Sequence, residues 1–176
     1  MNNRAYIGID PGMSGAIAIL EPNKPPVLMV MPILAKVELD VDKIGGIVYN
    51  RNNVHVVIED VHSVYGSSAA AMFSFGFGCG SLFTILKLAR VSFTKVPPKT
   101  WQKEMWQGVK PVMINTGKKN KDGSPKYKID TKATSLLAAT RLFPNTDFRA
   151  SDKCKKPHDG IIDSLLMAEF GRRKNY

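Results

Sequence analysis

Two short apolar runs in this chain each end in a carboxylate, and that placement narrows the folds open to it. Asp10 follows the run YIGI and precedes Pro11-Gly12, while Glu59 follows the run VHVVI. Short runs rich in Val and Ile are typical of buried strands. Both acids therefore fall at the carboxyl end of an expected strand, and ligands bind at that edge of an open α/β sheet.

A second pair of acids, Asp159 and Asp163, lies in the segment KPHDGIIDSLLMAE. The spacing i, i+4 puts both side chains on one face of a helix. Asp163 is surrounded by Ile and Leu residues, and a carboxylate on the apolar face of a helix needs a partner. Two strand ends and one helix can therefore converge on a single acidic pocket.

The order of the expected elements defines the fold class. Three short apolar segments at 5–9, 15–20 and 27–31 predict three consecutive antiparallel strands. Further helices are expected at 40–49, from Ser67 or Ser68 to 89, from Pro98 onwards, at 130–142 and at 158–172, with strands at 54–59 and 91–96 and a mobile basic loop at 108–128. This is the element order of the ribonuclease H-like fold, an α/β fold with a mixed five-stranded sheet flanked by helices.

Charge and size suggest a nucleic-acid partner for a single domain. The 176 residues, 44% of them hydrophobic, can bury one core, so we expect one domain over 1–176. The net charge is +10 and the isoelectric point about 9.7, as in basic nucleic-acid-binding domains. Residues 87–132 contain twelve Lys and Arg residues but only three acids, so the positive charge is concentrated in the middle of the chain.

The expected location is the cytoplasm. No apolar stretch is expected to reach the ~20 residues needed to cross a bilayer, and no signal peptide precedes the first strand, so no membrane partner is expected. Cys79 and Cys154 lack a second Cys or a His at zinc spacing, which argues against a structural zinc.

Four crowded carboxylates predict a metal-dependent site. Carboxylates of like charge repel one another within one site, and a divalent cation relieves this repulsion. Oxygen ligands suit Mg²⁺, for which Mn²⁺ can substitute, and two such ions can promote phosphodiester hydrolysis. Taken singly, Asp10 could be a turn former, Glu59 an exposed strand end and Asp159 a helix cap. His158 could be an auxiliary ligand or a surface residue.

The segments IGIDPG with Gly15-Ala16, VIEDV, and HDG with DSLLMA resemble the RuvC-type Holliday junction resolvases, particularly their bacteriophage relatives. The resemblance covers nearly the whole chain. It implies a homodimer that uses Mg²⁺ to nick opposing strands of four-way and other branched DNA, in a bacterial host's cytoplasm if the gene belongs to a phage. Asp10, Glu59 and Asp163 match three catalytic acids of that family. The remaining acid commonly stands three residues before the last one, where this chain has Gly160, and the chain instead offers Asp159 four residues before and His158 five before. We favour Asp159, because the i, i+4 spacing still faces the same pocket.

The resemblance also suggests which residues contact DNA. Lys103 and Lys132 fall where the family has lysines near the scissile phosphate, although either could be a solvated helix residue. Tyr65 follows the second acid, where the family carries an aromatic residue that touches bases at the junction centre, and its alternative is a packed side chain. The basic segment containing Lys118, Lys119 and Lys121 is also expected to bind phosphates.

The expected helix after Ser68 is rich in glycine, which costs ~1 kcal/mol at each interior position. Gly76 and Gly80 would be explained by a second subunit crossing there, or by close packing on the sheet of the same subunit. Trp101 is expected in the core, while the sequence leaves Trp106 open.

Other functions fit the sequence less well. The Asp10-Pro11-Gly12 segment is similar to the first phosphate loop of actin-like ATPases and sugar kinases, but those need two domains. No Walker-type glycine loop is present. A ribonuclease H-like nuclease acting on RNA–DNA hybrids and a catalytically silent junction-binding protein remain as alternatives.

Overall fold

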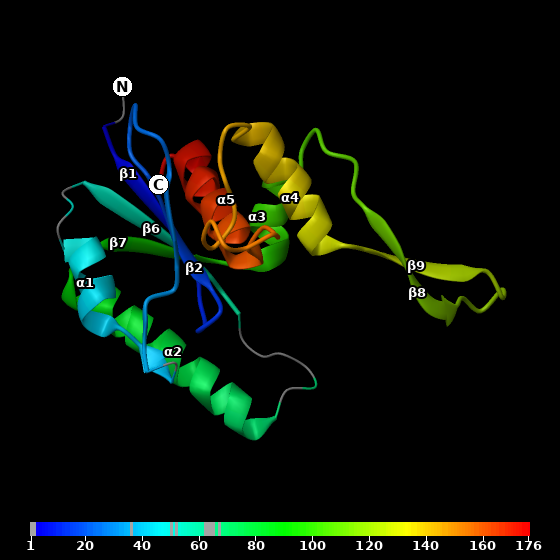
Figure 1. Cartoon of the computed structure of the whole chain (residues 1–176), viewed down its shortest axis with the longest axis horizontal. Coiled ribbons are helices and arrows are strands. Elements are labelled where there is room, and N and C mark those ends of the chain that lie inside the picture. The colour runs from blue at the N-terminus through cyan, green and yellow to red at the C-terminus, as the bar shows by residue number, and fades with distance from the viewer. Residues whose placement is uncertain (1–2, 36, 50, 52, 62–65, 67) are drawn as a thin grey trace.

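The computed structural model describes all residues except 1–2, 36, 50, 52, 62–65 and 67. A five-stranded sheet forms the centre of the molecule, with helices on both faces and a separate hairpin extending from one side (Figure 1). The strands are β1 (Ala5–Asp10), β2 (Ala16–Leu20), β3 (Val27–Val30), β6 (Val54–Glu59) and β7 (Ser92–Val96) in the sheet, with the short β4 (Ile33–Leu34) and β5 (Glu38–Leu39) paired outside it. The helices are α1 (Val41–Tyr49), α2 (Ala69–Leu88), α3 (Pro98–Met105), α4 (Thr131–Leu142) and α5 (Asp159–Lys174).

The sheet is mixed and has the strand order β3-β2-β1-β6-β7. Strands β1, β2 and β3 are antiparallel neighbours, whereas β6 lies parallel to β1 and β7 lies parallel to β6. Ile9 is in register with Ile58, so the two parallel strands end side by side. The expected α/β fold with a mixed five-stranded sheet is confirmed.

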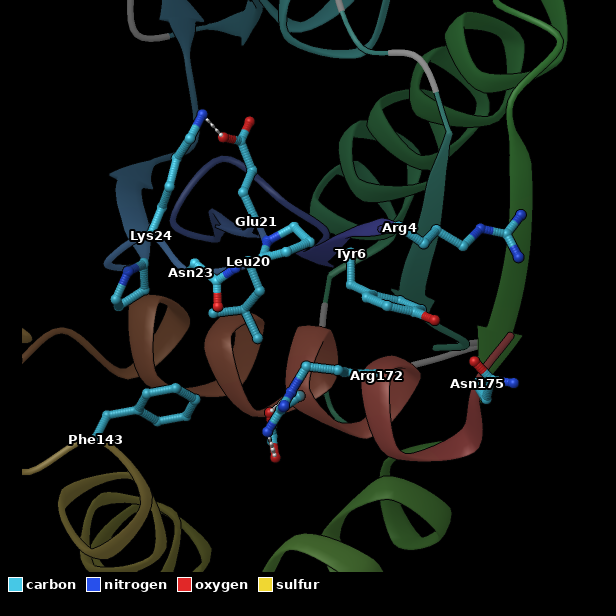
Figure 2. A pocket seen from close by; sticks show the side chains of 12 residues that line it. Arg4, Tyr6, Leu20, Glu21, Asn23, Lys24, Phe143, Arg172 and Asn175 are labelled. Carbon is cyan, nitrogen blue, oxygen red and sulfur yellow. Dashed lines mark hydrogen bonds and ion pairs between the residues drawn. The ribbon is translucent and has the colours of Figure 1, made fainter. Parts of the chain in front are cut away.

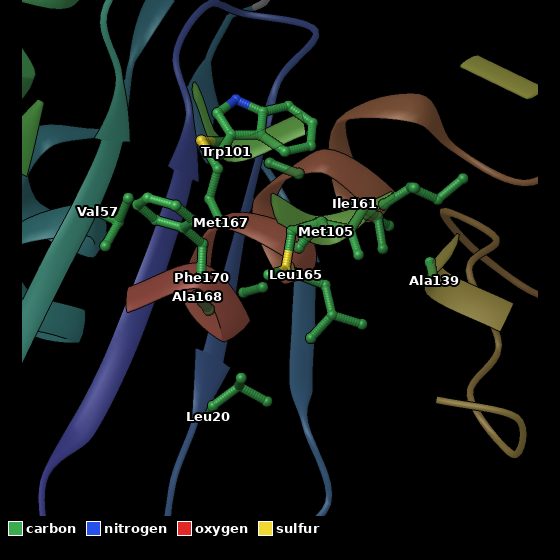
Figure 3. Close-up of a cluster of buried hydrophobic side chains, with 14 of the residues drawn as sticks. Leu20, Val57, Trp101, Met105, Ala139, Ile161, Leu165, Met167, Ala168 and Phe170 are labelled. Carbon is green, nitrogen blue, oxygen red and sulfur yellow. The ribbon is translucent and has the colours of Figure 1, made fainter. Parts of the chain in front are cut away.

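A separate apolar core lies on each face of the sheet. On one face, α5 lies across β1 and β2 and packs with α3 and α4, burying Trp101, Met105 and Phe170 (Figure 3). On the other face, α1 and α2 cover Ile7 and Ile9. Because both faces are covered, the central strands consist almost entirely of buried apolar residues, as the sequence runs indicate.

Helix α5 approaches β1 closely because a glycine faces it. A Cβ atom built on Gly8 would lie 1.9 Å from the carbonyl oxygen of Ser164, a distance that real atoms do not reach. Small residues on the sheet-facing side of α5, among them Gly171, allow the same approach along the helix. This contact fixes the height of α5 over β1 and therefore the position of every side chain near the helix start.

Helix boundaries follow the capping residues. Ser68 accepts a hydrogen bond from the backbone N–H of Ala71, and Asp130 accepts one from Ala133, at the starts of α2 and α4. Pro98 occupies the first turn of α3, as expected.

The prediction of a mobile loop over 108–128 is wrong. Most of that segment forms an antiparallel hairpin, β8 (Met113–Lys119) and β9 (Pro125–Ile129), closed by a turn over 120–124. Its lysines and Gly117 hide the alternating pattern by which strands are recognised. The hairpin turn is stabilised by hydrogen bonds from the backbone N–H and the hydroxyl of Ser124 to Asp122.

Helix α2 contradicts the expectation that no apolar stretch is long enough to cross a membrane. Among the described residues, this helix of 20 residues is long and apolar enough to do so, by length and composition alone. Its C-terminal half instead buries Leu82, Ile85 and Leu86 against the sheet. Residues 69–81 contain no fully buried side chain, so the N-terminal half of α2 extends beyond the core.

Candidate active site

Three of the four predicted acids converge at one edge of the sheet. Asp10 ends β1, Glu59 ends the neighbouring parallel strand β6, and Asp163 lies one turn into α5, which covers β1. All three side chains are only partly exposed. Each of Glu59 and Asp163 is close enough to Asp10 to repel its charge, so the predicted grouping of these acids is present in the fold.

Burial and mutual repulsion make these carboxylates hard to ionise. The pKa of Asp10 is raised to about 8, mainly by burial and further by the charges of Asp163, Glu59 and Asp159. The pKa of Asp163 is raised to about 7, mainly by burial, although a hydrogen bond from Ser135 lowers it. The pKa of Glu59 is raised by burial as well. Ionising all three carboxylates together is therefore unfavourable unless a cation compensates their charge.

The donor chemistry fits a hard divalent cation, because every converging group is a carboxylate oxygen. Within the described residues, no three His, Cys, Asp or Glu side chains are grouped closely enough to hold one ion as they stand. Binding of an ion would therefore require these side chains to draw together, which removal of their mutual repulsion favours.

Gly160 explains why the remaining acid cannot stand three residues before Asp163. A Cβ atom at this position would lie 2.8 Å from Oδ2 of Asp10 and 3.1 Å from Cα of Gly15. The first turn of α5 presses on the end of β1, and no side chain has room between them. An acid contributed by this turn must come from a neighbouring position, and Asp159 occupies one.

Asp159 lies at the rim of the site rather than inside it. Its side chain is 48% exposed and forms an ion pair with Lys132, at 2.5 Å between Nζ and Oδ2. The hydrogen bond from Lys132 to Asp159 raises the pKa of that lysine. Asp159 still contributes to the repulsion that raises the pKa of Asp163, so the two share a face of α5 as their spacing predicts. Lys132 is thereby placed beside the acids.

The residue that caps α5 is His158, whereas the sequence alternative gave that role to Asp159. Nδ1 of His158 accepts a hydrogen bond from the backbone N–H of Ile161 at 3.3 Å. One ring nitrogen is thus used to start the helix, and only Nε2 remains for a ligand. The acid at Asp159 stabilises the same helix terminus through the helix dipole.

Two tryptophans of the α3 region connect to the acids. Nε1 of the fully buried Trp101 donates a hydrogen bond of 3.0 Å to Oε1 of Glu59. Nε1 of Trp106 donates to Oγ of Ser135 at 3.3 Å, and the Ser135 hydroxyl is the group that hydrogen-bonds to Asp163. The expectation that Trp101 is a core residue is confirmed, but its contact with Glu59 was not predicted from the sequence. A buried indole N–H needs an acceptor, and that need is the only signal that could have indicated it.

The remaining predicted site residues lie elsewhere or cannot be placed. Lys103 is exposed on α3 and, within the described part of the chain, forms no ion pair with the four acids. Lys118 and Lys119 end strand β8, and Lys121 follows in the turn. Tyr65, the predicted base-contacting residue, lies outside the described residues.

Gly76 and Gly80 do not pack on the sheet of their own subunit. Among the described residues, and apart from the backbone of α2 itself and the neighbouring residues, no atom lies within 4 Å of a Cβ built on either residue, whereas one on Gly78 would contact Leu39 at 3.7 Å. Of the two explanations for these glycines, close packing within the subunit is therefore wrong for Gly76 and Gly80.

A cavity of about 600 Å³ lies at the opposite end of the sheet, between the start of β1 and the end of α5 (Figure 2). Its acids already have partners: Glu21 pairs with Lys24 and Arg51, and Glu169 pairs with Arg172 and Arg173. The lining therefore lacks the unbalanced carboxylates of the Asp10 site.

Comparison with known proteins shows which solved structures share this fold. No family model matches the chain, and no curated protein matches it. Among solved structures, it is similar to RuvC of Thermus thermophilus in complex with a Holliday junction substrate, with a TM-score of 0.55, 14% identity, and coverage of 97% of this chain and 96% of that chain. A second structure of Thermus thermophilus RuvC matches over the same shares at 14% identity, with a TM-score of 0.48. The chain has the ribonuclease H-like fold of RuvC.

Proposed function

We propose that this protein is a divalent-metal-dependent endonuclease that resolves Holliday junctions and related branched DNA by paired phosphodiester hydrolysis. The observation that carries the proposal is the convergence of Asp10, Glu59 and Asp163, from two strand ends and one helix, at one edge of a ribonuclease H-like sheet. The similarity to a RuvC that was solved with a Holliday junction supports branched DNA as the substrate. The net charge of +10 agrees with a polyanionic substrate.

Asp10, Glu59 and Asp163 would hold the metal, with Asp159 at the rim as a further ligand. Bound Mg²⁺ or Mn²⁺ would supply the Lewis acidity that activates water and stabilises the departing 3′ oxygen. Trp101 holds one oxygen of Glu59 in place. Lys132, paired with Asp159 and largely exposed, can turn its ammonium group to a phosphate at the entrance of the site.

Paired cleavage requires two sites, and one subunit carries one set of acids. A C₂ homodimer would present two identical sites to a two-fold-symmetric junction. The N-terminal half of α2 is the candidate interface: Phe73 is 76% exposed and Phe77 61% exposed, with Gly76 between them. Exposed aromatic side chains beside open glycines are suited to close contact with a second helix. Phe75 also lies next to Gly12, in the turn that follows Asp10, so such an interface would adjoin the acids.

The test compares substrates under matched conditions. Labelled four-way junction, linear duplex of the same sequences, and RNA–DNA hybrid are incubated with the protein with and without Mg²⁺. We expect symmetric nicks in the junction that require the metal, and little cutting of the other two. Preferential cutting of the hybrid would favour a ribonuclease H activity, and junction binding without cleavage under any divalent metal would identify a silent binder.

A further inference from the structure

The β8–β9 hairpin extends from the body of the molecule (Figure 1), and nearly all of its strand residues are exposed. Among its twelve strand residues only Thr116 is partly buried. A two-stranded hairpin is marginally stable by itself in water. This one also exposes apolar side chains, including Met113, Tyr127 and Ile129. The exposed apolar side chains and the lack of packing against the body both indicate that the hairpin binds a partner.

The base of the hairpin is fixed beside the acids. The backbone N–H of Asp130 donates to the carbonyl of Val112 at 2.8 Å, and the backbone N–H of Val112 donates to Oγ1 of Thr134 at 3.1 Å. These bonds join both ends of the hairpin to the start of α4. Lys132, in the first turn of that helix, contacts Asp159. A partner held by the hairpin would therefore lie next to the candidate active site.

The two faces of the hairpin differ in chemistry. Met113 pairs with Ile129 and Asn115 with Tyr127, which makes one face apolar and aromatic. Lys128 pairs with Ile114 on the opposite face, and Lys126 follows it two residues away on that face. The remaining lysines of the hairpin are at its tip: Lys118, Lys119 and Lys121.

The hairpin is strongly basic and its charge is not neutralised internally. Residues 113–129 contain five lysines and one acid, Asp122, which accepts hydrogen bonds from Ser124 in the turn. None of the five lysines forms an ion pair within the described residues. A net charge of +4 (five minus one) on 17 residues is complementary to a polyanion.

We propose that the β8–β9 hairpin is a DNA-holding arm that lies in the major groove of one duplex arm of the substrate, with its lysines on the flanking phosphates. The proposal rests on the branched-DNA substrate proposed above. The major groove of B-DNA admits a two-stranded β-ribbon. Seven strand residues at about 3.3 Å each span roughly 23 Å, which corresponds to about seven base pairs at ~3.4 Å. The arm thus extends contacts from the active site along the duplex.

The central experiment compares two double variants that lose the same charge. Lys126→Gln with Lys128→Gln removes the basic face of the hairpin, while Lys24→Gln with Lys43→Gln removes two exposed lysines from the β2–β3 turn and α1. Affinity for a four-way junction is measured by fluorescence anisotropy across a series of salt concentrations. Each lost phosphate contact reduces the slope of log K against log salt by about 0.9, so we expect a slope about two units shallower for the hairpin variant only. We also expect at least tenfold weaker binding at low salt.

Hydroxyl-radical footprinting supplies an independent readout. Wild-type protein should protect about seven base pairs along an arm next to the cleavage position. That protection should be absent in the Lys126 and Lys128 double variant, and absent when residues 113–129 are replaced by a short Gly-Ser linker between the neighbouring Val112 and Asp130. Circular dichroism of each variant checks that the body remains folded.

Two results would overturn the proposal. One is an unchanged slope and footprint in the hairpin variants. The other is binding that is insensitive to Lys126 and Lys128 but lost, together with self-association, in Met113→Ser with Tyr127→Ser, which would identify the apolar face as a protein contact. A cleavage assay distinguishes failure of this proposal from failure of the proposed function. If the wild type cuts junctions and the hairpin variants bind DNA normally, only the role of the hairpin is contradicted. If the wild type binds DNA through the hairpin but does not cut it, only the nuclease activity is contradicted.

Discussion

The hydrogen bond from Trp101 to Glu59 joins the apolar core to the acids. The indole is fully buried on α3, so its N–H is held in one direction and fixes one oxygen of the carboxylate. Asp163 receives similar support through Ser135, which Trp106 in turn contacts. The positions of two acids therefore depend on side chains that belong to the core.

Trp101→Phe tests this support. Phenylalanine keeps most of the buried volume but removes the donor, and a hydrogen bond to a charged group contributes about 1.5–3 kcal/mol. We expect a loss of roughly tenfold or more in cleavage rate at neutral pH. Because the bond lowers the pKa of Glu59, the acidic limb of the pH–rate profile should also move to higher pH. Trp106→Phe, whose contact is indirect, serves as the matched control, and a profile unchanged by Trp101→Phe would contradict the role.

The raised pKa values predict how the metal-free protein responds to pH. The pKa of Asp10 rises from 3.8 when unfolded to about 8 when folded, so between these values the folded state holds a proton that the unfolded state has released. Stability should therefore fall as pH rises from about 4 to about 8, and Asp163 acts in the same direction. Thermal unfolding in chelator at several pH values measures this. Asp10→Asn should flatten the curve, and stability that increases over this range would contradict the assignment.

Asp159 and His158 are distinguished by their contacts. Asp159→Asn removes a charge beside Asp163 and releases Lys132, so we expect cleavage to fall more than tenfold with little change in folding. His158→Ala removes the cap of α5 and should cost about 1 kcal/mol in stability while cleavage is largely kept. Cleavage rates and thermal unfolding are measured for both variants. The reverse ranking in cleavage would assign the metal to His158.

At the scale of elements, α2 carries the proposed subunit contact. Gly76→Leu or Gly80→Leu adds bulk where the described part of the chain, outside the backbone of α2 and the neighbouring residues, places no atom within 4 Å of the new Cβ, so the folded subunit should tolerate either change. A dimer that crosses there would be weakened by overpacking. Light scattering at micromolar concentration should show dimeric wild type and a shift towards monomer in the variants. The control is Ser81→Ala, which alters the same helix without adding bulk. Intact dimers in both leucine variants would show that the interface lies elsewhere.

Local signals predicted most elements because they act over a few residues. Apolar runs indicated β1 and β6, and the side chains of Ser68 and Asp130 indicated where two helices begin. The β8–β9 hairpin was missed because its strands bury almost nothing and so lack an apolar alternation. Its formation depends on turn chemistry and cross-strand pairing, which composition does not reveal.

The candidate site was predictable in part for the same reason. Strand ends and an i, i+4 spacing located Asp10, Glu59 and Asp163 without tertiary information. The ion pair of Asp159 with Lys132 and the contact of Trp101 with Glu59 join residues 27 or more positions apart, which no local pattern reports. Gly160 became interpretable only once α5 was seen pressing on Asp10.

At the scale of the whole molecule, acidic and basic functions are separated in space. The acids lie at one edge of the sheet, while five exposed lysines lie on a hairpin fixed next to that edge. Metal binding and phosphate binding can therefore be altered independently. A protein built in this way should lose cleavage without losing its hold on DNA when the acids alone are neutralised.

The most direct measurement determines cleavage and binding together for Asp10→Asn, Glu59→Gln and Asp163→Asn, on one labelled four-way junction with Mg²⁺. Single-turnover cleavage reports the acids, and anisotropy of the same junction reports the lysines. We predict that each variant loses cleavage while its affinity stays within a few-fold of wild type. Retained cleavage in all three would contradict the nuclease site.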